Sequence, residues 1–388
     1  DYVLLDEKDQ ILGDTYGYRD HRTDGMDAEV AKILPETELY GKTGIQKQIF
    51  NTVYQLMAVK QQTPELLQQA KTLLMLPDYF GFRLTGNKLS EYTNGSTTQL
   101  VNPDTFQWDK ELIRKLGYPE DIFLPLQMPG TKVGQLLPEI QKEVGFDLEV
   151  VLCGSHDTAS AVMAVPQTEG DGIYISSGTW SLMGIESLKP VITEDAAAAN
   201  FTNEGGYDHR FRFLKNIMGL WMIQSVRHEY NDAYSFAQLC DMAEESKEFP
   251  SRVDVNDQSF LSPDSMVEAI RQYCHKTGQP VPESVGELTS VVYRSLAQSY
   301  GETVRGLEKI AGKTYDSIHI IGGGSNAAYL NQLTADATGK TVYAGPGEAT
   351  AIGNLLAQMI HAGDLADLKS ARKCVRESFE IKTFAPAK

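Results

Sequence analysis

Cysteine, tryptophan and positive charge are scarce in this chain of 388 residues. It contains 4 cysteines and 3 tryptophans, and its 35 lysines and arginines stand against 52 aspartates and glutamates, giving a formal net charge of -17. The basic residues form no long run, so no surface suited to a phosphate backbone is indicated. We therefore expect no nucleic-acid partner.

The cysteines and the apolar segments indicate the cellular compartment in which the protein works. Cys153, Cys240, Cys274 and Cys374 are widely spaced and include no Cys-x-x-Cys pair, so neither a zinc site nor a disulfide framework is indicated. No apolar stretch reaches the roughly 18 uncharged residues that a membrane span requires, and no basic segment followed by an apolar one opens the chain. We expect a soluble, cytoplasmic protein with reduced thiols and no membrane contact.

Length and periodicity favour an α/β protein of two or three domains. Apolar runs of strand length alternate with helical patterns, which is typical of that architecture. We place the domain division at 1–165 and 166–388. The main expected elements are a strand over 1–6, helices over 45–60 and 64–74, a buried strand over 148–153 with a helix after it, a strand–turn–strand over 172–184, a long amphipathic helix over 288–310 and a strand over 317–321.

The small-residue turn from Gly154 to Ala161 holds one carboxylate between a strand pattern and a helix pattern. Ligands of α/β proteins bind outside the carboxyl ends of strands, so Asp157 stands where chemistry is expected. Ser, Asp and Thr also cap helices, so the pattern alone leaves a catalytic carboxylate and a helix cap equally open. A hydrolase pairing His156 with Asp157 is a weaker alternative, because neighbours on an extended turn point apart.

Two glycine-containing turns are candidates for nucleotide binding. Gly322, Gly323 and Gly324 follow a strand pattern and precede a helical one, where missing Cβ atoms and helix N–H groups allow a phosphate to approach. The turn is neither a Walker A sequence nor a Gly-x-Gly-x-x-Gly dinucleotide motif. In the second turn, over 176–179, backbone amides and the Thr179 hydroxyl are able to cradle phosphate oxygens. Plain turns explain both patterns equally well.

Several motifs occur together and in a characteristic order along the chain. The most specific are SHDTASAV at 155–162, SSGTWSLMG at 176–184, TNEGG at 202–206 and KNIMGLW at 215–221, and the others include YRD at 18–20, LPDYF at 76–80, EYTN at 91–94 and AGP at 344–346. With these motifs the chain resembles the FGGY carbohydrate kinases over essentially its whole length. Within that family it is most similar to the branch that phosphorylates L-rhamnulose.

The resemblance implies an actin-like, hexokinase/Hsp70-type fold of two α/β domains, with ATP and sugar in the cleft between them. Asp157 corresponds to the family's catalytic base, which accepts the proton of the sugar O1 hydroxyl as that oxygen attacks the γ-phosphoryl group. The residues implied to contact the sugar, besides Asp157, are His156, Thr158 and Asn216. The residues implied to contact ATP are Thr179, Gln224 and Gly323.

Several of these residues have a purely structural alternative. His156 can be a core histidine that bonds to the backbone, and Asn216 can anchor a turn before a helix over 217–221. A single glutamine on a helix, such as Gln224, is often a solvated surface residue. The roles of Asp20 and Asp78 stay undecided between structure and substrate binding.

The implied reaction converts L-rhamnulose and ATP, with Mg²⁺, into L-rhamnulose 1-phosphate and ADP in L-rhamnose catabolism. Kinases for fuculose, xylulose or gluconate are the nearest alternatives, and the 202–206 and 215–221 motifs favour rhamnulose over them. A non-catalytic actin-fold sugar-binding protein is a further alternative, but such a protein has no need to retain Asp157. The sequence indicates neither the Mg²⁺ ligands nor an oligomeric state.

The N-terminus opens directly on a strand pattern, from Asp1 to Asp6. Members of the family place a strand and an Asp-bearing, glycine-containing phosphate turn before this point. We therefore expect the chain to begin inside the first domain, as part of a longer protein.

Overall fold

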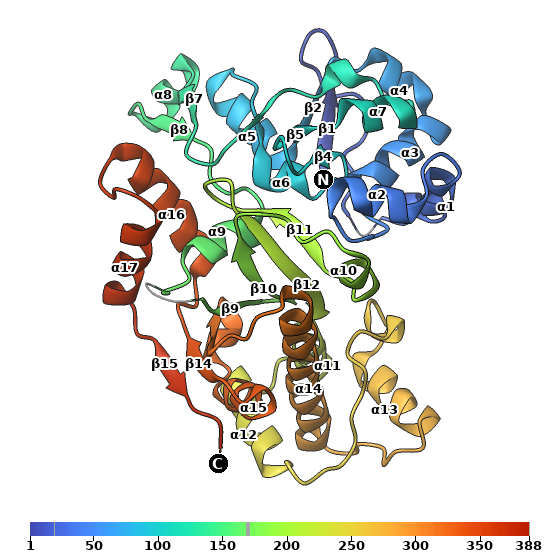
Figure 1. Ribbon diagram of the computed structural model, residues 1–388, viewed down its shortest axis with the longest axis vertical. Coiled ribbons are helices and arrows are strands. Elements are labelled where there is room, and N and C mark those ends of the chain that lie inside the picture. The colour runs from blue at the N-terminus through green and yellow to red at the C-terminus, as the bar shows by residue number, and fades with distance from the viewer. Residues whose placement is uncertain (19, 168–170, 388) are drawn as a thin grey trace. The chain divides into compact units, whose positions relative to one another are not determined.

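The computed structural model describes residues 1–18, 20–167 and 171–387, and Figure 1 labels most of its helices and strands. It confirms a mixed α/β architecture. Two compact units are present, the first made of Asp1–Ser160, Glu186–Phe213 and Gly353–Leu368, and the second of Ala161–Ile185, Leu214–Ile352 and Lys369–Lys388. Arg19, in one of the family-like motifs, lies outside the described residues.

The first unit contains short strands and mostly short helices. In chain order they are β1 (Tyr2–Leu5), α1 (Met26–Ala31), α2 (Glu36–Thr43), α3 (Thr52–Gln62), α4 (Pro64–Gln69), β2 (Thr72–Met75), α5 (Leu76–Thr85), β3 (Ser90–Glu91), α6 (Tyr92–Ser96), β4 (Val101–Asn102), β5 (Gln107–Trp108), α7 (Lys110–Leu116), β6 (Leu126–Gln127), β7 (Lys132–Gln135), α8 (Pro138–Val144), β8 (Glu149–Val151), α10 (Glu194–Ala198) and β11 (Thr202–Gly205), with 3-10 turns at His21–Thr23 and Glu120–Ile122. Helix α3 is the centre of the core, because its side chains from Thr52 to Val59 are all buried.

The expected strand at the N-terminus is confirmed, since β1 pairs antiparallel with β2. The two helices expected over 45–60 and 64–74 are shorter than predicted. The first begins only at Thr52, because the preceding backbone bonds elsewhere, as when the Gln46 N–H donates to Thr202 Oγ1 at 3.2 Å. The second ends at Gln69, since the buried residues Thr72–Met75 form β2 against β1.

The second unit is built around a sheet with helices packed on it. Its elements are β9 (Ile173–Ser177), α11 (Trp221–Glu229), α12 (Phe236–Glu245), α13 (Met266–Lys276), α14 (Val285–Ala311), β13 (Ser317–Ile321), α15 (Ala328–Thr338), β14 (Thr341–Ala344), α17 (Leu368–Ser378) and β15 (Lys382–Phe384), with 3-10 turns at Gln258–Phe260 and Gly323–Asn326. Five elements cross the boundaries between the units along the chain, and they are α9 (Asp157–Met163), β10 (Trp180–Ser187), β12 (Phe211–Met218), α16 (Ala349–Ala362) and α17, of which only Leu368 belongs to the first unit.

The sheet runs in the order β11-β12-β10-β9-β13-β14-β15. The strand–turn–strand expected over 172–184 is confirmed, because β9 and β10 pair antiparallel with Ser177 opposite Ser181. Strand β13 is parallel to both β9 and β14, and β15 is antiparallel to β14. The long helix is confirmed as α14, which starts with a capping box of Ser284 and Glu287 and packs against α12 and α15 (Figure 1). Among the residues described, no helix is long and apolar enough to span a bilayer.

The triple-glycine turn after β13 is shaped by packing. Gly322 has a φ of +82°, and a Cβ there would lie 2.9 Å from the carbonyl oxygen of Ser177. A Cβ on Gly324 would overlap the Ser177 side chain, whereas one on Gly323 would meet nothing within 4 Å. Two of the three glycines thus allow the turn to pack on β9, and Gly323 faces open space.

Helix α16 contacts α9, the helix that starts with Asp157, through a glycine. A Cβ at Gly353 would overlap the backbone carbonyl of Ser160, whereas a Cβ at Gly41, within α2, would meet nothing within 4 Å. We expect Gly353→Ala to lower the free energy of unfolding by about 1–3 kcal/mol through overpacking. Gly41→Ala is the matched control, expected to raise it by about 0.5–1 kcal/mol through helix propensity. Urea unfolding measures both, and equal stabilisation by the two substitutions would contradict the close packing.

Candidate active site

Asp157 begins helix α9, directly after the turn at Gly154 that follows β8. The strand expected over 148–153 is less buried than predicted, because Leu148 is 42% exposed and only Leu152 is buried in that segment. Strand β8 pairs antiparallel with β7. The carboxyl edge of a parallel sheet therefore does not present Asp157, and the start of α9 does.

The Asp157 carboxylate is exposed and ionised. Its side chain is 80% exposed, and Oδ1 accepts hydrogen bonds from the Thr158 N–H at 2.6 Å and the Thr158 hydroxyl at 3.2 Å. Desolvation raises the pKa of Asp157. Its interactions with His156, Thr158 and Arg212 lower the pKa by more than that, so the pKa lies below the usual 3.8. The group is a weak base held in one orientation by the next residue.

The ring of His156 lies between two carboxylates. Its Nδ1 is 3.5 Å from Asp157 Oδ1 and its Nε2 is 3.6 Å from Glu204 Oε2. The expectation that His156 and Asp157 point apart is wrong, because Asp157 is the first residue of α9 and its carboxylate lies beside the His156 ring. Burial and the charge of Arg212 lower the pKa of His156 below 6.5, more than the two carboxylates raise it. The imidazole is therefore neutral at physiological pH.

Behind His156 lies a buried ion pair that the sequence did not indicate. Arg212 is fully buried, its Nη2 is 3.2 Å from Glu204 Oε2, and its Nε donates to the carbonyl of Gly205 at 2.9 Å. Glu204 lies in the TNEGG motif, but nothing in that pattern reveals that its strand, β11, is buried and that a partner follows on β12. Buried charges occur in pairs of this kind, because an isolated one is too costly to desolvate.

Two carboxyl groups, one on α5 and one on β3, are buried next to each other. Glu91 is fully buried, and its backbone N–H donates to Asp78 Oδ2 at 3.2 Å. Asp78 Oδ1 has no hydrogen-bond partner within the described part of the chain. Burial and the charge of Glu91 raise the pKa of Asp78 to about 8, so its carboxyl is protonated at neutral pH.

Asp20, by contrast, is exposed and caps a 3-10 turn by accepting from the Arg22 N–H at 2.8 Å.

The residues expected on the nucleotide side lie in the second unit. Thr179 is exposed at the tip of the β9–β10 hairpin, Gly323 is exposed after β13, and Gln224 is half-buried on α11. The start of α11 is tied to the hairpin, because the Leu220 N–H donates to the Gly178 carbonyl at 2.9 Å and the Trp221 N–H to the Thr179 carbonyl at 3.2 Å.

The triple-glycine turn packs on the same hairpin, through Ser177. The structure therefore brings the segments that carry Thr179, Gln224 and Gly323 to one place. Asn216 lies in the middle of β12, so it does not anchor a turn before a helix. The helix expected over 217–221 is wrong as well, since β12 continues to Met218 and α11 begins at Trp221.

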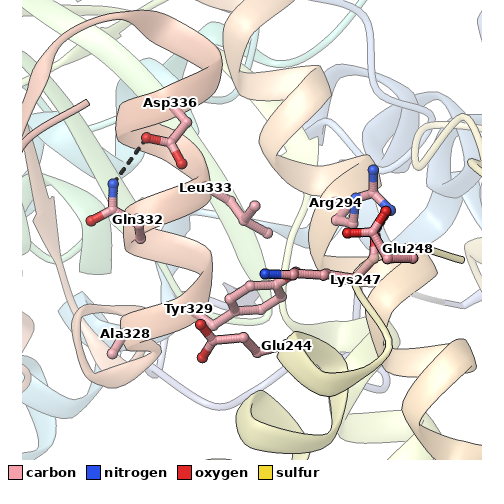
Figure 2. A pocket seen from close by; sticks show the side chains of 9 residues that line it. All are labelled: Glu244, Lys247, Glu248, Arg294, Ala328, Tyr329, Gln332, Leu333 and Asp336. Carbon is pink, nitrogen blue, oxygen red and sulfur yellow. Dashed lines mark hydrogen bonds between the residues drawn. The ribbon is translucent and has the colours of Figure 1, made fainter. Parts of the chain in front are cut away.

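A surface pocket of about 560 Å³ in the second unit holds none of these residues (Figure 2). It lies among α12, α14 and α15, and its lining mixes Lys247 and Arg294 with the carboxylates of Glu244, Glu248 and Asp336. Arg294 is already engaged, because it donates to the Phe249 carbonyl at 2.8 Å. The pocket is therefore separate from the residues that the sequence indicates.

Within the ranges that the structure describes, no three His, Cys, Asp or Glu side chains gather to hold a metal ion.

Comparison with known proteins identifies the family. Residues 1–164 match the N-terminal domain, and residues 173–362 the C-terminal domain, of the FGGY family of carbohydrate kinases. The chain belongs to this family. It is 52% identical to a rhamnulokinase of Halalkalibacterium halodurans and 46% identical to one of Bacillus subtilis, over 100% of its own length and 82% and 79% of theirs.

Solved FGGY kinases have the same fold. A ligand-bound xylulose kinase from Lactobacillus acidophilus superposes with a TM-score of 0.78 at 16% identity, covering 100% of this chain and 78% of that one. Plasmodium falciparum glycerol kinase with ADP gives a TM-score of 0.76 at 15% identity, covering 99% and 77%. The actin-like two-domain fold is therefore confirmed. Membership of the FGGY family makes the protein a carbohydrate kinase rather than a hydrolase.

The raised pKa of Asp78 makes the stability of this FGGY chain depend on pH. The unfolded carboxyl loses its proton near pH 3.8 and the folded one near about pH 8. Between these values the folded protein holds a proton that the unfolded chain has lost, so the free energy of unfolding falls as the pH rises. Asp78→Asn keeps the acceptor for the Glu91 N–H but removes the titration. We expect its melting temperature, relative to the unsubstituted protein, to rise steadily from about pH 5 to about pH 8.

Thermal scans across this pH range measure the difference. Asp147→Asn, at an exposed aspartate of the same unit, is the control and is expected to show a constant offset. A constant offset for Asp78→Asn as well would mean that Asp78 is already ionised in the folded protein.

Proposed function

We propose that this chain transfers the γ-phosphoryl group of ATP to O1 of L-rhamnulose, giving L-rhamnulose 1-phosphate and ADP, in L-rhamnose catabolism. The observation that carries the proposal is the similarity to curated rhamnulokinases, up to 52% identical over the whole chain. The likeness to xylulose and glycerol kinases, at 16% and 15% identity, supports the fold alone.

Asp157 is the base in this proposal. The O1 hydroxyl gives its proton to the carboxylate as O1 attacks the γ-phosphorus and the bond from that phosphorus to the ADP oxygen breaks. A loose phosphoryl-transfer transition state makes little demand on basicity and a large one on position. An exposed, ionised carboxylate with a lowered pKa, oriented by Thr158, meets that demand.

His156, Thr158 and Asn216 contact the sugar. Neutral His156 carries one N–H and one acceptor nitrogen, which suits hydroxyl groups that both donate and accept. The buried pair of Glu204 and Arg212 limits the positions open to its ring.

On the nucleotide side, Thr179, Gln224 and Gly323 contact ATP. The exposed backbone at Gly323, where no Cβ stands between the ligand and the chain, supports this role. Mg²⁺ enters bound to the ATP phosphates and neutralises their charge during transfer, so we treat it as part of the nucleotide substrate. In this proposal residues 1–165 form the sugar-side domain and 166–388 the nucleotide-binding domain.

The decisive test is Asp157→Asn in a coupled ADP-release assay with Mg-ATP, on the full-length gene product. We expect a preference for L-rhamnulose over L-fuculose, D-xylulose and glycerol, and a fall in kcat of about 100- to 10,000-fold in the variant, because the proton acceptor is lost. Asp147→Asn, which changes an exposed aspartate of the same unit, is expected to keep full activity.

Other outcomes of this assay separate the alternatives. Faster turnover of D-xylulose or L-fuculose would assign the chain to another ketose. Sugar binding without turnover by the unsubstituted protein would favour a non-catalytic sugar-binding protein.

A second prediction concerns sugar contact by His156. His156→Ala removes one hydrogen bond to the sugar, worth about 0.5–1.5 kcal/mol, so KM for L-rhamnulose is expected to rise about threefold to tenfold while KM for ATP stays unchanged. His21→Ala, at a histidine whose side chain is 93% exposed, is the control. An equal rise in both KM values would point to a general structural defect instead of a sugar contact.

A further inference from the structure

Glu91 is a buried carboxylate that accepts five hydrogen bonds. At the start of α6, it accepts from the Thr93 N–H at 2.6 Å, the Thr93 hydroxyl at 2.6 Å and the Asn94 N–H at 3.0 Å. The other two donors belong to Ser155, whose N–H lies at 3.1 Å and whose hydroxyl lies at 2.6 Å. Burial raises the pKa of Glu91, while the hydrogen bonds from the Ser155 hydroxyl, the Thr93 hydroxyl and N–H, and the Asn94 N–H act against that shift.

A structural role at the helix explains only part of this arrangement. An N-cap side chain accepts hydrogen bonds from the next turn of its own helix, which accounts for Thr93 and Asn94. It does not account for Ser155, which is 64 residues further along the chain and two residues before Asp157.

The first turn of α6 makes another bond to the same segment. Thr93 Oγ1 accepts from the His156 backbone N–H at 3.2 Å, while its own hydroxyl proton goes to Glu91. On the other side of the turn, the Ser160 hydroxyl donates to the Gly154 carbonyl at 2.7 Å. Two consecutive backbone N–H groups, of Ser155 and His156, are therefore fixed immediately before Asp157.

We propose that Glu91 is a positioning residue for phosphoryl transfer: by holding Ser155 it fixes the main chain from which His156 and Asp157 project. The inference rests on the proposed role of Asp157 as the base. A displacement of about 1 Å in a reacting group can cost about 100-fold in rate. Fixing the backbone N–H groups of Ser155 and His156 therefore keeps Asp157 in the position that the reaction requires.

The geometry defines variants that separate capping from positioning. In Glu91→Gln one carboxylate oxygen becomes an NH₂ donor, and every partner named above is itself a donor, so at least one bond is lost in either orientation. Glu91→Asp keeps the charge and a good N-cap residue, but its side chain is one methylene shorter and withdraws from Ser155. Ser155→Ala removes the hydroxyl bond of the bridge and leaves the α6 cap intact.

The measurements are kcat, both KM values and the melting temperature of the full-length gene product. We expect Ser155→Ala to lower kcat about threefold to tenfold, from the loss of one hydrogen bond, and Glu91→Gln to lower it about 10- to 100-fold. In the double variant the two effects should combine less than multiplicatively, because both substitutions break the same link. Glu91→Asp is expected to keep most of the melting temperature but not kcat.

Asp109→Ala is the matched control, because alanine removes the N-cap hydrogen bond. Asp109 caps α7 in the same unit by accepting from the Leu112 N–H at 2.9 Å, and we expect its substitution to affect the melting temperature but not kcat. Normal kcat in Glu91→Gln, multiplicative effects in the double variant, or recovery of kcat together with stability in Glu91→Asp would each overturn the positioning role. These results differ from failure of the proposed function, in which the unsubstituted protein turns over no sugar and the role of Glu91 falls with it.

Discussion

The burial of carboxyl groups is the constraint on which the first unit depends. Moving a carboxylate out of water costs several kcal/mol unless donors or an opposite charge replace the water. Glu91 meets this requirement with five donors from two distant segments, so the same hydrogen bonds that make its burial tolerable also join α6 to the turn before α9.

Four carboxyl groups of this unit are accommodated in four different ways. Asp78 stays protonated, Glu91 is surrounded by donors, and Glu204 is paired with the fully buried Arg212. Asp157 alone among them is largely exposed, with a pKa below the usual value. The three buried groups hold the structure in place, and the exposed one is left in the charged form that a proton acceptor needs.

Local patterns predicted the elements whose partners are near in sequence. The β9–β10 hairpin and the amphipathic stripe of α14 are visible in short windows, and the structure has both. The helix predicted over 64–74 ends early, at Gln69, because Thr72–Met75 pairs with the N-terminal strand Tyr2–Leu5, and that pairing depends on residues far along the chain. Tertiary contacts of this kind override local propensity.

The same limit applies to the site. The short segment from His156 to Thr158 was recognisable because a small-residue turn with one carboxylate is a local feature. Glu91 and Glu204 were not recognisable as parts of one arrangement, since their partners are at Ser155 and Arg212 on other elements. In the EYTN motif, only the capping of α6 can be read from the sequence around Glu91.

In the proposed reaction, the position of the base matters more than its basicity. A general base that must remove a proton early needs a raised pKa, which burial would supply at a cost in stability. The loose transition state of phosphoryl transfer deprotonates its nucleophile late, so a carboxylate of ordinary or lowered pKa is sufficient if its distance and direction are correct. The proposed roles are consistent with this demand: Glu91 is buried among hydrogen-bond donors, and Asp157 is exposed on the turn that Glu91 holds.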